Sequence, residues 1–242
     1  MSDTFMVKLA GVFVFLSMAA EFAAIGVAAS HGAGPASMNV MNWGVGEQLT
    51  FFQPPWMEVL FSLGILAPCL SMLGWLATYY VLAPGGPAAL CGVIVTSLGF
   101  LLGVMAEMIR FSVAATLPAR YLAAVDVAKP AVLALGAFLT QLFVLLAQTS
   151  LVLIYAVGMP LVTIAILRGR ALPRWLGWVL VIPSILVGYV GGPLVLLGYA
   201  SIGGPFIGVG LNIFFVWYLV LGVVLLRWHP TRDGAREVAV SY

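Results

Sequence analysis

Residues 131–167, AVLALGAFLTQLFVLLAQTSLVLIYAVGMPLVTIAIL, decide how this chain is folded. The run is predominantly apolar and contains no charged residue. As a single helix it would be about 55 Å long, against a hydrocarbon core of about 30 Å. It therefore forms either one long helix that protrudes from a bilayer or a hairpin of two short helices. This choice sets the number of membrane spans at six or seven.

The middle of this run favours one long helix. A hairpin would turn near Gln148, Thr149 and Ser150, the most polar positions, but these residues include neither Gly nor Pro and make a poor tight turn. Gly158 and Pro160 instead predict a kink within a continuous helix. We therefore predict an all-α bundle with six transmembrane helices, and a seven-span bundle is the alternative.

Composition places the whole chain in a membrane. Of its 242 residues, 63% are hydrophobic and 7% are charged, whereas a soluble domain has about 25% charged residues. Because apolar stretches recur along residues 1–242, we predict a single transmembrane domain with the lipid bilayer as its surroundings. The formal net charge of +2 gives no reason to expect a nucleic-acid partner, and other membrane proteins are candidate partners. No cofactor is indicated.

The predicted spans and links follow from apolar runs and breakers. Pro118 should end the third span and Pro205 should close a short link before the sixth, because proline interrupts a helix. The connection at residues 31–55 is rich in Gly, Met and aromatic residues, so it should fold back on the bundle at the outer interface. Besides the run that opens at residue 131, the spans are residues 9–30, 56–83, 88–117, 175–199 and 206–228, followed by a short tail at 229–242.

The placement of cations predicts the orientation of the six-span bundle. Arg120 and Lys129 fall on one side of it. Seven cations fall on the other side: Lys8, Arg168, Arg170, Arg174, Arg227, Arg232 and Arg236. Because cytoplasmic loops carry the excess of Lys and Arg, both termini should be cytoplasmic. A seven-span bundle would divide the cations eight to one with an external N-terminus, so the cations alone do not decide between the two topologies.

The entry to the fifth span resembles a known pattern. Leu172, Pro173, Arg174, Leu176 and Gly177 follow a Gly/Arg turn at the end of the long fourth segment. This arrangement resembles a domain-of-unknown-function family of bacterial six-span membrane proteins, whose fifth helix opens with Leu/Ile-Pro-Arg-x-Leu-Gly. Such proteins often carry an acidic residue in helix three, where Glu107 lies here. The resemblance implies a six-helix fold in a bacterial-type inner membrane and no established activity.

Charged side chains within the apolar segments mark the candidate site. The stretch LLGVMAEMIRF, residues 101–111, places Glu107 and Arg110 three residues apart, which makes them neighbours on one helical face. Ionisable groups at membrane depth are costly and tend to face a bundle interior, so they are functional candidates. In the six-span topology the other polar candidates also fall in the outer or middle zone, and the full set of ligand-binding candidates is Glu21, Glu58, Glu107, Arg110, His31, Gln141 and Asn212.

Together these residues predict a polar, carboxylate- and Arg-lined cavity in the outer half that binds or transports a small ligand, an ion or a proton. A purely structural ion pair would explain the same charges. Two further alternatives are a non-catalytic accessory subunit of a larger membrane complex and a carboxylate-dependent intramembrane enzyme. No serine-nucleophile, phosphate-loop or Cys/His metal motif appears, so no catalytic residue and no metal site is predicted. Cys69 and Cys91 are expected to be buried free thiols.

Overall fold

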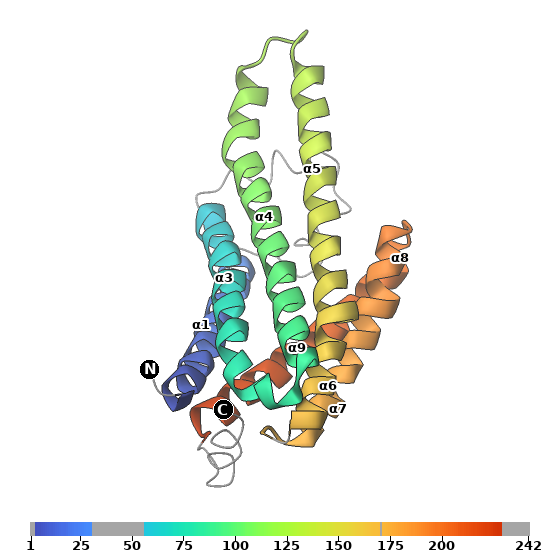
Figure 1. Ribbon diagram of the computed structural model, residues 1–242. Coiled ribbons are helices and arrows are strands. Elements are labelled where there is room, and N and C mark those ends of the chain that lie inside the picture. Colours follow the sequence, from blue (N-terminus) through green and yellow to red (C-terminus); the bar gives the residue numbers. More distant parts are fainter. Residues whose placement is uncertain (1–2, 31–55, 170, 229–242) are drawn as a thin grey trace.

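The computed structural model describes residues 3–30, 56–169 and 171–228, and every structural statement below concerns these residues. Within them the chain is an all-α bundle without strands, and six helical segments are long and apolar enough to cross a membrane (Figure 1). The elements are α1 (Asp3–Ser30), α3 (Trp56–Leu82), η2 (Ala83–Gly85), α4 (Pro87–Ala123), α5 (Lys129–Leu151), η3 (Val152–Gly158), α6 (Met159–Gly169), α7 (Arg174–Pro183), η4 (Ser184–Gly191), α8 (Gly192–Leu196) and α9 (Ala200–Leu226).

The fourth apolar segment is one continuous helix, so the six-span prediction is confirmed. α5, η3 and α6 follow one another without a turn from Lys129 to Gly169. The polar residues in the middle pack instead of turning, because the buried Ser150 hydroxyl donates a hydrogen bond of 2.7 Å to the carbonyl oxygen of Gly99 on α4. Ser150 therefore belongs to a helix that packs on α4 and not to the turn of a hairpin.

The kink predicted at Gly158 and Pro160 takes the form of a π-helical segment, η3, directly before the proline. Pro160 has no N–H, so it cannot donate to the carbonyl oxygen of Ala156 one turn earlier. The Tyr189 hydroxyl on η4 donates to that same oxygen over 2.6 Å. η4 is itself π-helical and follows Pro183. The two π-helical segments η3 and η4 therefore meet. Tyr189 on η4 gives the Ala156 carbonyl oxygen the hydrogen bond that Pro160 cannot donate.

α4 and α5 form a hairpin that rises well beyond the ends of the other helices (Figure 1). The prediction that Pro118 ends the third span is wrong, because α4 continues through it to Ala123. The proline removes one backbone hydrogen bond, and packing between the two arms of the hairpin outweighs that loss. Val113 and Leu117 are buried there against side chains that include Val132, Leu133 and Leu139.

The start of the last span also differs from the expectation. α9 begins at Ala200 and runs through Pro205, so residues 200–205 are helix rather than link. Pro205 lies near the helix start, and a proline there costs little more than one hydrogen bond with the first turn. The connection from α8 consists of residues 197–199, followed by the helix.

A stacked aromatic group forms the centre of the core. Trp75 on α3 stacks on Trp217 and Tyr218 of α9, with ring centroids 6.2 and 6.0 Å apart. Phe214 stacks on the same α9 rings, and Tyr155 on η3 meets Phe214 edge-on at 5.3 Å. These side chains are all at most 3% exposed, so they join three membrane helices through large apolar surfaces.

Candidate functional site

The two charged residues of α4 form an ion pair. The Nη2 atom of Arg110 lies 2.9 Å from Oε2 of Glu107, and the side chains retain 20% and 21% of their exposure. Residues three apart lie on one face of a helix, so α4 itself brings them together. Both side chains are therefore mostly, but not fully, buried.

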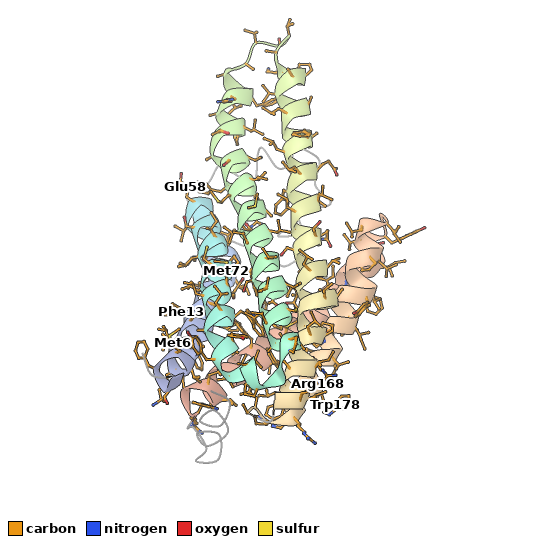
Figure 2. The ribbon with its side chains drawn as sticks, in the orientation of Figure 1. Met6, Phe13, Glu58, Met72, Arg168 and Trp178 are labelled. Carbon is orange, nitrogen blue, oxygen red and sulfur yellow. The ribbon has the colours of Figure 1, made fainter. Side chains whose placement is uncertain are left out.

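Glu107 packs directly against α3. A Cβ atom built on Gly64 would lie only 3.3 Å from Oε2 of Glu107, so glycine makes room for the carboxylate. Gly64 is six residues along the helix from Glu58, whose side chain Figure 2 shows at the end where α3 begins. Six residues correspond to about 9 Å, which places the Glu107 carboxylate just inside that end of the helix.

Arg110 reaches across to α5. Its guanidinium carbon lies 5.5 Å from the centre of the Phe143 ring, within the range of a cation–π contact. Phe143 is a buried residue of α5. Arg110 therefore contacts both the Glu107 carboxylate, which packs against α3, and the Phe143 ring on α5.

Glu21 on α1 completes the charged group. Its carboxylate interacts electrostatically with both Glu107 and Arg110. α1 packs on α3 and α3 packs on α4, which explains how a residue early in the chain meets residues of the third span. Glu21 thus adds a second carboxylate near the Glu107–Arg110 ion pair, and these three residues are called the carboxylate site below.

The remaining predicted site residues lie apart from this group. Glu58 is exposed at the end of α3, and Gln141 is exposed on α5. Asn212 is exposed, and its side-chain amide donates a 2.8 Å hydrogen bond to the Gly208 carbonyl oxygen of its own helix. His31 falls outside the described residues. The structure therefore brings together three of the seven candidates.

Several buried polar residues were not predicted from the sequence. The hydroxyls of Ser17 on α1 and Ser71 on α3 form a 2.6 Å hydrogen bond inside the bundle. Ser17 lies four residues before Glu21, on the same helical face, and Ser71 lies seven residues after Gly64. These spacings are the sequence signal that could have pointed to Ser17 and Ser71 as a buried polar pair. The signal is weak, because serine is also common at helix contacts in membranes.

Metal ligands do not cluster in the part of the chain that the structure describes. It contains no group of three or more His, Cys, Asp or Glu placed to hold a metal ion. The expectation of two buried thiols is wrong for Cys91, which is exposed, while Cys69 is half-buried and both are free. A thiol is weakly polar, so a surface that faces lipid accepts it at little cost.

The fold and the charged residues define the class of this chain as a multi-pass membrane protein of six helices with ionisable side chains inside its helical bundle. Comparison with protein-family models, with curated proteins and with solved structures finds no match. The family resemblance of residues 172–177 therefore remains a prediction.

Proposed function

We propose that this protein binds a small monovalent cation, either a proton or an alkali metal ion, at the carboxylate site. The observation that carries this proposal is the ratio of charges: two carboxylates, Glu21 and Glu107, lie near the guanidinium of Arg110. Arg110 is in direct contact with Glu107, whereas the ion pairs among the described residues do not include Glu21.

The physical reason is the cost of an uncompensated charge. With all three side chains ionised the site carries one net negative charge in surroundings of low polarity. An unpaired charge there costs several kcal/mol, which a bound cation removes. Carboxylates within membrane segments are found in ion and proton pathways for this reason. The partial exposure of Glu107 and Arg110, about 9 Å from the end of α3, supports access from the outer end.

The proposed orientation puts this access on the outside of a bacterial-type inner membrane. Arg168 lies at the end of the bundle that holds both helix termini of the chain (Figure 2). Lys8, Arg174 and Arg227 are near helix ends on that side, whereas Arg120 and Lys129 lie at the opposite end, in the hairpin. The positive-inside rule then makes the termini cytoplasmic and the hairpin external.

We expect single cysteines to report this orientation in a background with Cys69→Ala and Cys91→Ala. Val127, 93% exposed at the hairpin turn, should be labelled as Val127→Cys by a membrane-impermeant maleimide in intact spheroplasts. Arg168→Cys should be labelled only after permeabilisation. The reverse pattern would contradict the orientation and would turn the carboxylate site toward the cytoplasm.

Cation binding is testable with dicyclohexylcarbodiimide, which reacts with protonated carboxyl groups in apolar surroundings. We expect mass spectrometry of the purified protein to find the adduct on Glu21 or Glu107. If the cation is an alkali ion, sodium or potassium should slow this labelling at constant pH. If it is a proton, only pH should change the rate. Glu21→Gln and Glu107→Gln should each abolish the cation-sensitive or pH-sensitive adduct.

Glu58 provides the matched control for this experiment. It is a carboxylate at the outer end of the neighbouring helix, but it is exposed and lies apart from Arg110. Glu58→Gln should leave labelling of the carboxylate site unchanged. The proposal is contradicted if Glu21 and Glu107 remain unlabelled at every pH and in every salt.

A further inference from the structure

A second group of polar side chains lies deeper in the bundle than the carboxylate site. Ser17 and Ser71, joined by their 2.6 Å hydrogen bond, are 1% and 6% exposed. Ser17 is one helical turn inward of Glu21 on α1. Ser71 is two turns inward of Gly64 on α3, beside Met72, which Figure 2 shows near the middle of that helix. The pair therefore lies near mid-depth in the membrane.

A tyrosine extends this group. The Tyr218 hydroxyl on α9 is buried without a hydrogen-bond partner among the described residues. It lies against Gly74 of α3, three residues and so about one turn from Ser71. Buried hydroxyls without a settled partner are rare, and such groups often have a functional role or bind water.

The space around these hydroxyls is small. A Cβ atom on Gly74 would lie 3.1 Å from the Tyr218 hydroxyl oxygen and 3.5 Å from side-chain atoms of Phe13 and Val14. The indole of Trp75 adds a buried N–H, which can donate a hydrogen bond but cannot accept one. Packing this close leaves no room for a hydrated metal ion, and the described residues contain no group of His, Cys, Asp or Glu placed to replace its water. A chain of hydroxyls passes a proton without moving any heavy atom far.

We propose that Ser17, Ser71 and Tyr218 form the central segment of a proton path that begins at Glu21. This inference rests on the proposed function and narrows its cation to a proton. The path connects the outer carboxylates with the middle of α9, about 12 Å from the inner end of that helix at Leu226.

The transfer leaves every hydroxyl neutral once it is complete. The proton bound at Glu21 moves to the Ser17 oxygen as Ser17 gives its own proton to Ser71 and Ser71 gives its proton to Tyr218. Tyr218 in turn gives its proton to water that reaches it from the inner end of the bundle, so each hydroxyl gains one proton and loses one. The Ser17–Ser71 hydrogen bond supplies one such step at 2.6 Å. Rotation of the hydroxyls then restores the starting arrangement, and Glu21 accepts the next proton from the outer side.

The test measures proton uptake in proteoliposomes with a pH-sensitive dye inside and a potassium diffusion potential as driving force. We expect Tyr218→Phe to lower the uptake rate at least tenfold, because it removes one hydroxyl and little volume. The double variant Ser17→Ala/Ser71→Ala should do the same and covers the case in which Tyr218→Phe folds poorly. Tyr80→Phe is the matched control, since it removes a hydroxyl from a tyrosine that is 47% exposed on α3, and it should keep the wild-type rate.

Carbodiimide labelling of the same samples separates this inference from the proposed function. We expect Tyr218→Phe to keep pH-sensitive labelling of the carboxylate site while proton uptake falls. Wild-type uptake that survives Tyr218→Phe and the double serine variant would overturn the path and leave the cation site standing. Uptake of sodium instead of protons would have the same consequence. The path would likewise be overturned, and the cation site kept, if no ion were taken up while carbodiimide labelling stayed sensitive to cations. Loss of both uptake and labelling sensitivity in the wild type would overturn both proposals.

Discussion

Replacing Gly188 with alanine should lower the free energy of unfolding by about 3 kcal/mol, at the upper end of the range for overpacked cores. The added Cβ atom would lie 2.5 Å from the Ala156 amide nitrogen and 2.6 Å from the Tyr155 carbonyl carbon. Both are backbone atoms, so no side chain can rotate away. The two π-helical segments would have to separate, which would also pull the Tyr189 hydroxyl from its acceptor. Titration with SDS in mixed micelles measures this change.

Gly208 offers the matched control on α9. Nothing lies within 4 Å of a Cβ atom placed there, and the residue is exposed. Gly208→Ala should leave the unfolding free energy within about 0.5 kcal/mol of the wild type or raise it slightly, because alanine favours a helix over glycine. Equal losses in Gly188→Ala and Gly208→Ala would show that the crossing of η3 and η4 does not depend on close backbone contact.

Arg110→Met should destabilise the protein by about 2–3 kcal/mol, because it removes the cation paired with Glu107 and leaves two carboxylates in the bundle uncompensated. The value is below that for a fully buried pair, since the arginine and Glu107 keep about a fifth of their exposure. Methionine retains an unbranched apolar stem beside Phe143, so the loss reports mainly the charge. Arg110→Lys, which keeps that charge, should cost less.

A double-mutant cycle with Glu107→Gln isolates the pair. We expect the double variant Glu107→Gln/Arg110→Met to be more stable than the sum of the single effects predicts, by about 1–2 kcal/mol. The same cycle with Glu58→Gln should show no coupling, because Glu58 lies apart from Arg110. Additive effects of Glu107→Gln and Arg110→Met would mean that the 2.9 Å contact contributes nothing to stability.

Apolar run length and the absence of a turn signal were enough to predict six helices and the continuous fourth segment. Errors arose at Pro118 and Pro205, where proline alone suggested a helix end. The cost of a proline is local, about 3 kcal/mol in a helix interior. Packing of Leu117 on the opposite arm of the hairpin offsets it at Pro118, and that contact depends on a partner more than ten residues away.

In the candidate site, too, some features were predictable from the sequence and others depend on the tertiary structure. Glu107 and Arg110 were predictable as a pair, because a spacing of three places two side chains on one face of any helix. Glu21 could be recognised as a costly charge within a span, but the spacing gives no information about which helix it faces. The approach of Glu107 to α3 depends on the missing side chain of Gly64, and glycine is frequent throughout this sequence.

The sequence by itself therefore determined the membrane class, the number of helices and the local Glu107–Arg110 pair, since these depend on run length and helical periodicity. Three features were decided by the tertiary structure alone. α1 brings Glu21 near this pair, Tyr189 donates a hydrogen bond to the Ala156 carbonyl oxygen that Pro160 cannot reach, and the hydroxyls of Ser17 and Ser71 form a hydrogen bond. The physical reason is that helices in lipid associate through close packing and scattered polar contacts, which leave no periodic pattern along the chain.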